Sequence, residues 1–156
     1  MIEFETVIKL QIKRGLSQSQ INKLIYYSNH DLKVKRFTHD SKRFKDLDSF
    51  VTWYTRDIQI FVLTNSSNNL LGLIWIKPRV NPYSKYKHTF AVRVYKPIRG
   101  KGYSHDFAKK VLSTLKIDGL WLSTSIKNIA ALKLYNKLGF KQIGKEDNQI
   151  IMELGF

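Results

Sequence analysis

The chain has 156 residues, of which 43% are hydrophobic and 13% aromatic, a composition that supports a folded core and excludes a disordered protein. It contains no cysteine, which excludes disulfides, a cysteine-ligated zinc and a thiol nucleophile. Lysines and arginines outnumber acidic residues by 27 to 12, and the resulting charge of +15 favours either anionic partners or simply a lysine-rich solvated surface.

Several classes of protein are disfavoured by the rest of the composition. The four histidines show no metal-ligand spacing, so we expect no metal. The first ten residues carry acids where a signal peptide has cations, and no apolar run approaches the ~18 residues of a membrane span. With no repeat or linker in residues 1–156, we expect a single soluble domain in the cytoplasm, without membrane contact and as a monomer or homodimer.

The first half of the chain begins with an expected strand over residues 4–10, followed by an amphipathic helix over residues 16–28. A second helix is expected over residues 46–57, where Asp46 or Asp48 can cap the start. Its buried stripe is expected to consist of Phe50, Val51, Trp53 and Tyr54.

Strands dominate the middle of the chain. Two apolar runs, residues 58–64 and 70–76, are separated by a five-residue polar loop, which predicts a hairpin. A basic, aromatic loop over residues 79–88 then leads to a further strand over residues 89–95.

The second half alternates helices and strands. A helix over residues 105–115 has an apolar face of Ala108, Val111, Leu112 and Leu115, and a buried strand follows at residues 119–125. The next helix, over residues 128–139, has the apolar positions Ala131, Leu134, Tyr135 and Leu138 and a stop at Gly139. A closing hairpin is expected from residues 140–144 and 149–154, with residues 145–148 as its turn.

This order of elements predicts an α/β (α+β) fold. The expected succession is β-α-α-β-β-β-α-β-α-β-β, which implies a mixed sheet with helices on both faces. A strand, a glycine loop and a helix stand at its centre.

The glycine loop in "VYKPIRGKGYSHDFAKKVLSTL", residues 94–115, suggests an anion site. Gly100 and Gly102 are too close together for a Walker A loop, and His105 stands where a dinucleotide fingerprint requires glycine. Successive backbone N–H groups from Arg99 to Ser104 could instead surround a pyrophosphate at the start of a helix. The alternative is a glycine-rich turn before an ordinary helix.

Two segments resemble the GNAT superfamily of acyl-CoA-dependent N-acetyltransferases. The loop is similar to that family's R/Q-x-x-G-x-G/A motif, with Arg99 first, Gly102 at the central glycine and Ser104 in place of the final Gly or Ala. Ser104 is small enough to keep the backbone approachable and could cap the helix. The segment "NIAALKLYNKLGF", residues 128–140, is similar to the family's N-x-x-A-x-x-L-Y-x-K-x-G-F pattern.

The resemblance implies a GNAT-like sheet of six to seven mostly antiparallel strands, with a central splay between two of them. It also implies acetyl-CoA as co-substrate. Its pyrophosphate would lie on the backbone of Arg99, Gly100, Lys101, Gly102, Tyr103 and Ser104, and its pantetheine arm along that of Val92, Arg93 and Val94. Asn128 would contact the cofactor, and Tyr135 would stand near the sulfur as general acid; the alternatives are a plain helix cap and a core residue.

The base and the acceptor amine are less defined. His88, Glu3 and Glu5 are candidate bases, or the amine could lose its proton to water. A polyamine would be repelled by the positive charge, whereas an amine on an anionic molecule is favoured. The loop residues Tyr83, Lys85, Tyr86, Lys87 and His88 form either a binding surface or an exposed mobile loop.

The leading function is therefore acetyl transfer from acetyl-CoA to the primary amine of a small molecule or peptide. The alternatives are an acetyltransferase acting on an amine of tRNA or another nucleic acid, and an acyl-CoA-binding module without turnover. Backbone N–H groups near Val94 would stabilise the oxyanion of the transfer.

Overall fold

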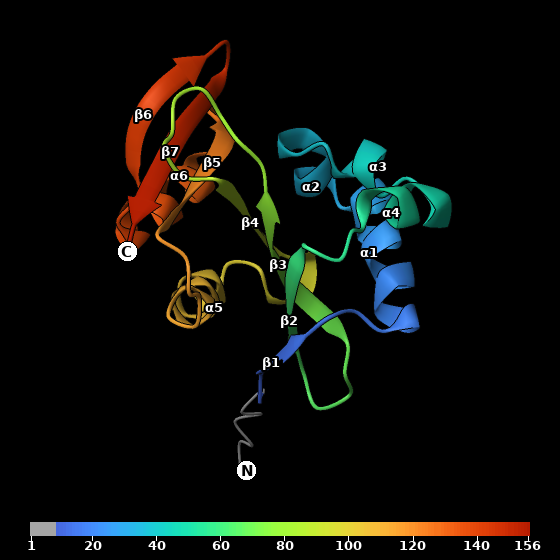
Figure 1. The fold of residues 1–156 in the computed structure, drawn as a ribbon. Helices are drawn as coiled ribbons and strands as arrows, with labels where there is room; N and C mark the ends of the chain where they lie inside the picture. Colours follow the sequence, from blue (N-terminus) through green and yellow to red (C-terminus); the bar gives the residue numbers. More distant parts are fainter. Residues whose placement is uncertain (1–8) are drawn as a thin grey trace.

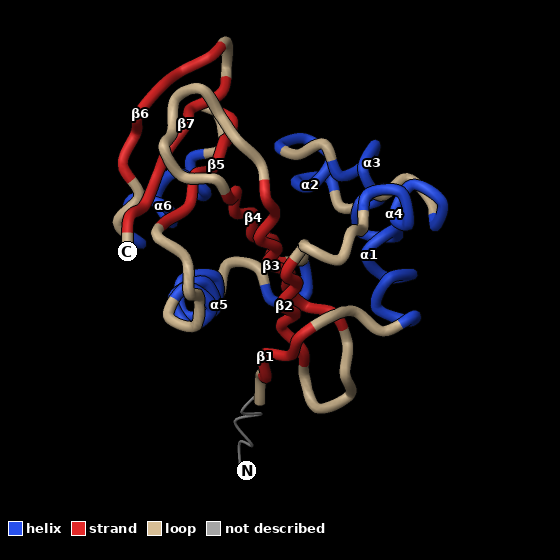
Figure 2. The backbone as a smooth tube through the Cα atoms, in the orientation of Figure 1, coloured by secondary structure: helices blue, strands red, loops and turns tan. Residues whose placement is uncertain are grey.

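A seven-stranded sheet crosses the molecule, with its strands in the order β1-β2-β3-β4-β5-β7-β6 (Figure 1). The structure is a computed structural model that describes residues 9–156. Every neighbouring pair of strands is antiparallel except β4 and β5, which are parallel. Figure 2 shows the strands as a band with helices to either side. The expected mixed, mostly antiparallel sheet is confirmed.

The elements have the following bounds. The strands are β1 Gln11–Arg14, β2 Gln59–Thr64, β3 Leu70–Pro78, β4 His88–Val94, β5 Gly119–Ser125, β6 Lys141–Glu146 and β7 Gln149–Gly155. The helices are α1 Gln18–His30, α2 Leu32–Phe37, α3 Asp40–Arg43, α4 Leu47–Trp53, α5 Tyr103–Leu112 and α6 Ile129–Leu138, with a 3-10 turn at Lys96–Ile98.

The first strand lies later than the sequence predicts. Of the strand expected over residues 4–10, only Lys9 and Leu10 are described, and both precede β1; the remainder lies outside the described residues. β1 is an edge strand whose four residues are all exposed, so it carries no alternating apolar signal. Gly15, with a φ of 81°, turns the chain from β1 toward α1.

The N-terminal helices agree only partly with the predictions. α1 is confirmed, with a capping box between Ser17 and Gln20. α4 is capped by Asp46 but covers only seven residues, and the expected stripe is wrong at Val51 and Tyr54, which are 62% and 47% exposed. α2 and α3 have six and four residues and were not expected, because such short helices show no apolar period.

The second half of the chain follows the predicted order closely. The β2–β3 hairpin, α6 and the left-handed Gly139 at the end of α6 are confirmed. α5 ends at Leu112, so Leu115 lies beyond it. The closing hairpin turns at Asp147 and Asn148 alone, because β6 extends to Glu146.

Two apolar cores pack on opposite faces of the sheet. Alternate β3 side chains divide between them, Leu73 and Trp75 facing α1–α4, and Ile74 and Ile76 facing α5 and α6. Figure 1 shows these two groups of helices on either side of the strands. The sheet is therefore covered on both faces, and both layers reach its centre.

The basic loop between β3 and β4 packs on the sheet. Trp121 Nε1 donates to the Arg79 carbonyl at 2.7 Å, and the Ser84 hydroxyl donates to Glu153 at 2.8 Å. A Cβ on Gly119 would come within 2.6 Å of the Tyr86 ring, so glycine is needed for this close approach. The loop is thus held down at several points along its length.

Within residues 9–156, no helix is both long enough and apolar enough to cross a membrane.

Candidate active site

β4 and β5 diverge at the centre of the sheet. Although these strands are parallel neighbours, only Thr89 and Trp121 pair in register between them. The residues from Val92 to Val94 lie beyond that pair, and on their other side they are paired in register with β3. The expected central splay is therefore present.

The backbone of alternate β4 residues faces the resulting gap. Tyr95 N–H donates to the Leu71 carbonyl, so the backbone of Tyr95 faces β3. Because successive residues of a strand direct their backbone groups to opposite sides, the backbone of Arg93 also faces β3. Val92 and Val94 are the residues whose backbone faces the gap.

Two guanidinium groups cover the carbonyls of these valines. Arg93 Nη1 donates to the Val92 carbonyl at 3.0 Å, and Arg99 Nε donates to the Val94 carbonyl at 3.2 Å. With the carbonyls occupied, the N–H groups of Val92 and Val94 remain as the backbone donors directed at the gap. An arm with amide carbonyls would match them.

The glycine loop follows directly after β4. Gly100 and Gly102 have φ values of 81° and 82°, and no atom lies within 4 Å of the position that a Cβ would take on either. Gly102 is the N-cap of α5 and provides no side-chain cap, and Ser104 is already inside the helix, so Ser104 does not cap it. The first N–H groups of α5 are therefore left for another acceptor, beside open space.

The Arg99 side chain holds this loop in place. Its Nη1 and Nη2 donate to the two Asp31 oxygens at 3.1 and 2.7 Å. Asp31 is buried at the start of α2, where it also accepts from the N–H groups of Lys33 and Val34. Burial raises the pKa of the Asp31 carboxyl, but Arg99 and the N–H groups of Val34 and Lys33 together outweigh burial, so the pKa is lowered. This bidentate ion pair connects the loop to the N-terminal helices.

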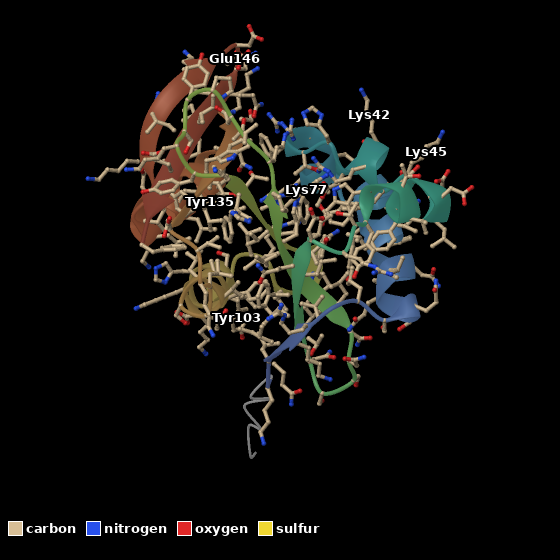
Figure 3. All side chains as sticks on the ribbon, in the orientation of Figure 1. Lys42, Lys45, Lys77, Tyr103, Tyr135 and Glu146 are labelled. Atoms are coloured by element: carbon tan, nitrogen blue, oxygen red, sulfur yellow. The ribbon has the colours of Figure 1, made fainter. Side chains whose placement is uncertain are left out.

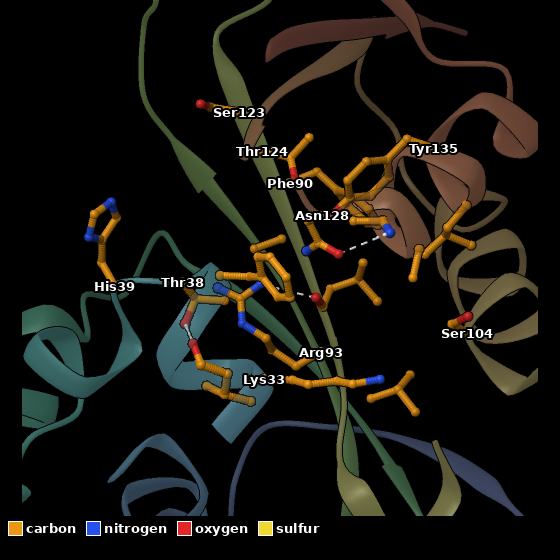
Figure 4. A pocket seen from close by; sticks show the side chains of 18 of the residues that line it. Lys33, Thr38, His39, Phe90, Arg93, Ser104, Ser123, Thr124, Asn128 and Tyr135 are labelled. Carbon is orange, nitrogen blue, oxygen red and sulfur yellow. Dashed lines mark hydrogen bonds between the residues drawn. The ribbon is translucent and has the colours of Figure 1, made fainter. Parts of the chain in front are cut away.

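α6 brings two of the expected residues to the same region. Asn128 caps the helix, its side-chain oxygen accepting from Ala131 N–H at 3.3 Å, which leaves its Nδ2 as a donor (Figure 4). Tyr135 is 6% exposed and lies between Phe90 and Phe140, with ring centroids 6.5 and 5.7 Å away. Burial raises the pKa of the Tyr135 phenol, although the charge of Arg93 opposes it, so the phenol is protonated at neutral pH.

A buried ion cluster stands behind the gap. Asp40 is fully buried and accepts from Arg93 Nε at 2.7 Å and from Arg43 Nη1. Burial raises the pKa of Asp40, but the two guanidinium groups outweigh it, and the pKa is lowered. Both arginines lie over the Trp75 ring, 4.8 Å away for Arg93 and 5.3 Å for Arg43. Arg93 is thus fixed by its side chain, a role that the sequence did not suggest.

One cavity of about 1130 Å³ joins these features. It is lined from both faces of the sheet, so it passes through the gap between β4 and β5 (Figure 4). Lys101 is exposed and does not line it. The other candidate residues all do: Val92, Arg93, Val94, Arg99, Gly100, Gly102, Tyr103, Ser104, Asn128 and Tyr135.

The candidate bases do not gather there. Among the described residues, His88 is not part of the cavity lining, and Glu3 and Glu5 lie outside those residues. In the part of the chain that the structure describes, the carboxylates that line the cavity are Glu146, the last residue of β6, and Asp147 in the turn that follows, and both are exposed. No group of three or more potential metal-ligating His, Asp or Glu side chains is found within residues 9–156.

Comparison with protein families decides the class. Residues 26–140 match the acetyltransferase (GNAT) family, a range that includes both the glycine loop and α6. The chain belongs to the GNAT acetyltransferase family. No curated protein sequence matches it.

Solved structures share the fold of this GNAT acetyltransferase at low identity. A domain from Methanocaldococcus jannaschii has a TM-score of 0.77 at 18% identity, covering 96% of this chain and 99% of its own. Spermidine N-acetyltransferase from Vibrio cholerae, in complex with CoA and spermine, has a TM-score of 0.71 at 18% identity, covering 92% of both chains. A GNAT acetyltransferase from Staphylococcus aureus has a TM-score of 0.68 at 20% identity, covering 94% of this chain and 99% of its own.

Sequence reasoning missed the side chains that hold this GNAT site together. Asp31 and Asp40 are buried carboxylates in short helices, and each reaches an arginine more than 50 residues away. A carboxylate in a weakly periodic segment carries no local signal of burial. The only available hint was the scarcity of acids in so basic a chain.

Proposed function

We propose that this GNAT acetyltransferase transfers an acetyl group from acetyl-CoA to a primary amine, with both substrates bound in one cavity. The observation that carries the proposal is the meeting of the glycine loop, the β4–β5 gap and a buried, protonated Tyr135 in that cavity.

The loop is suited to the diphosphate of the co-substrate. Gly100 and Gly102 leave open space above a left-handed backbone, and α5 begins there with uncapped N–H groups. A helix start of this kind favours a phosphate by its hydrogen bonds and by its dipole. Backbone groups from Arg99 to Ser104 would hold the diphosphate, and the Arg99 guanidinium would keep the loop in position through Asp31.

The gap is suited to the pantetheine arm. Val92 and Val94 direct backbone N–H groups toward it, which could receive the amide carbonyls of the arm. The Asn128 amide could donate to the same molecule. A thioester carried along this path would end near Tyr135.

The transfer itself forms a C–N bond and breaks a C–S bond. The neutral amine attacks the thioester carbonyl, and a β4 N–H group near Val94 stabilises the charge that develops on its oxygen. Tyr135 then gives its phenolic proton to the leaving thiolate, while the attacking nitrogen loses a proton to water, from which the phenolate is protonated again. Because burial favours the neutral phenol, this donor is available across the physiological pH range.

A direct assay tests the proposal. Purified protein is incubated with acetyl-CoA and a panel of primary amines, and the released CoA is detected with a thiol reagent. The protein has no cysteine of its own, so it adds no thiol background, and samples without amine or without protein measure the remaining background. We expect amine-dependent thiol release and a rise in melting temperature with acetyl-CoA.

The outcomes separate the possible functions. A melting shift with acetyl-CoA but no release with any amine would favour the acyl-CoA-binding module without turnover. A shift with RNA and none with CoA ligands would favour a nucleic-acid-binding protein and contradict the proposal.

A further inference from the structure

The cavity continues beyond the proposed CoA site to the opposite face of the sheet. There it is lined by Trp53, Trp75, Lys77 and Arg79, which belong to α4, to β3 and to the start of the following loop. We call these four residues the acceptor wall, because the other end of the cavity is assigned to the co-substrate. Figure 4 shows the N-terminal helices, with Thr38 and His39, across the cavity from Tyr135 and Asn128.

Positive charge dominates the lining of the cavity. Eight lysines and arginines line it, against the two carboxylates Glu146 and Asp147. Those carboxylates are exposed where the β6–β7 hairpin turns, and Figure 3 shows Glu146 at that end of β6. The acceptor end therefore has a large excess of cations.

Lys77 and Arg79 contribute charge that no carboxylate balances. Arg43 and Arg93 share the buried Asp40, and Arg99 is paired with Asp31. Within residues 9–156, no carboxylate lies within ion-pair distance of Lys77 or Arg79. A bound anion is the natural counter-charge for this pair.

The fold holds the Lys77 side chain and the backbone of Arg79 in place. Lys77 belongs to β3 opposite Thr89, and its Nζ lies over the Trp53 ring, 5.9 Å from the centroid. The Arg79 backbone is fixed at both ends, since its N–H donates to the Lys87 carbonyl at 2.9 Å and its carbonyl accepts from Trp121 Nε1. Lys77 is half-buried, which distinguishes it from a lysine on an open surface, and Arg79 extends an exposed side chain from an anchored backbone.

The surroundings strengthen the preference for an anion. Trp75 in the acceptor wall and Trp121, which also lines the cavity, are each 4% exposed, so part of the lining is apolar and shields charges poorly. Burial lowers the pKa of Arg43; Asp40 opposes this shift, whereas the nearby charges of Arg93 and Arg79 add to it, so cations oppose one another here. A second ammonium group would add to that opposition, whereas an anion would relieve it.

We infer that the acceptor is a small primary amine that also carries a carboxylate or phosphate, and that Lys77 and Arg79 hold this anionic group. The inference rests on the proposed function and narrows it to a substrate class. The acceptor is small at its reacting end because the cavity of about 1130 Å³ also receives the arm of the co-substrate. The same positive field lowers the pKa of the amine, which promotes the neutral form needed for attack.

Equilibrium binding tests the inference without relying on turnover. Protein saturated with CoA is titrated by calorimetry with amines that differ only in their tail. One series is ethanolamine, phosphoethanolamine and ethylenediamine, and another is 4-aminobutanol, 4-aminobutyrate and 1,4-diaminobutane. We expect the anionic member of at least one series to bind about tenfold more tightly than its neutral partner, and the diamine to bind least.

A matched pair of double variants locates the effect. Lys77→Gln/Arg79→Gln removes two charges from the acceptor wall, and Lys42→Gln/Lys45→Gln removes two exposed charges outside the cavity (Figure 3). We expect the first to weaken binding of the anionic amine about tenfold or more, and the second less than twofold. Both should keep the wild-type circular dichroism spectrum and affinity for CoA.

The inference is overturned by any of three results. They are tighter binding of a diamine than of the anionic amines, equal effects of the two double variants, or binding of none of these amines while RNA binds. If no thiol is released with any amine but the anionic amines bind as expected, the transfer reaction fails and the acceptor class stands. The two proposals can thus be judged separately.

Discussion

Tyr135 gives the clearest test at the scale of a single residue. Tyr135→Phe keeps the ring between Phe90 and Phe140 but removes the proton donor. We expect kcat for amine acetylation to fall about 100-fold, with the dissociation constant for acetyl-CoA within twofold of wild type. Steady-state kinetics and calorimetry check the two values.

The pH profile of kcat supplies the control. Because burial raises the pKa of the phenol above its usual 10, wild-type kcat should show no alkaline decline below about pH 10 that is due to loss of this proton. A variant that turns over at the wild-type rate would mean that Tyr135 only packs the core.

Asp40 has a structural role that can be measured separately. Asp40→Asn would leave Arg93 and Arg43 partly buried without their counter-charge, so we expect a loss of about 3 kcal/mol in the free energy of unfolding. The pKa of Asp40 is lowered in the folded state, so its stabilisation is complete above its unfolded value and is lost as the pH falls through the folded value.

Urea titrations at several pH values measure this effect. We expect the variant's stability to fall less steeply than that of wild type when the pH is lowered below about 4. The exposed Asp48→Asn serves as control and should behave as wild type. Equal destabilisation by both changes would refute the role given to the buried cluster.

At the scale of elements, the glycine loop makes a prediction with a close internal control. Gly102→Ala would strain a residue with a φ of 82° and place a methyl group in the open space above the loop. We expect CoA to bind about tenfold more weakly and stability to fall by about 1 kcal/mol. Calorimetry and thermal unfolding give the two values.

Gly15→Ala is the matched control. Gly15 has a φ of 81° and equally open surroundings, but it lies between β1 and α1 and does not line the main cavity. It should lose similar stability and keep the wild-type affinity for CoA. Equal loss of CoA affinity in both variants would show that strain alone, and not the position of the loop, explains the change.

Elements with a strong local signal were predictable from the sequence. Two apolar runs and the polar five-residue loop between them defined the β2–β3 hairpin, and Asn128 with Gly139 marked both ends of α6. α2 and α3 had no such signal, since they are only six and four residues long. In α4, Val51 lies on the exposed side of the helix and Tyr54 lies beyond its last residue, Trp53, so both are exposed instead of joining the core.

The site was predictable as a set of positions but not as a network. The candidate site residues in β4, the glycine loop and α6 could be identified from sequence motifs, and all of them except Lys101 line one cavity. The contacts of Arg99 with Asp31 and of Arg93 with Asp40 join residues 68 and 53 positions apart. Such contacts depend on how distant segments pack in the folded protein, and the residues around each partner in the sequence do not indicate them.

At the scale of the whole molecule, the splay is what links the two halves. The core around Trp75 packs the N-terminal helices on one face, and the core around Tyr135 packs α5 and α6 on the other. Where β4 and β5 separate, a cavity lined from both faces runs between these cores. The proposed function depends on this passage, because the co-substrate and the amine would meet inside it.

A crystal structure of the protein with bound CoA tests this account most directly. We predict the diphosphate within about 3 Å of backbone N–H groups between Arg99 and Ser104, the pantetheine arm between β4 and β5, and the sulfur next to the Tyr135 hydroxyl. A diphosphate bound elsewhere, or an arm that does not enter the gap between β4 and β5, would contradict it.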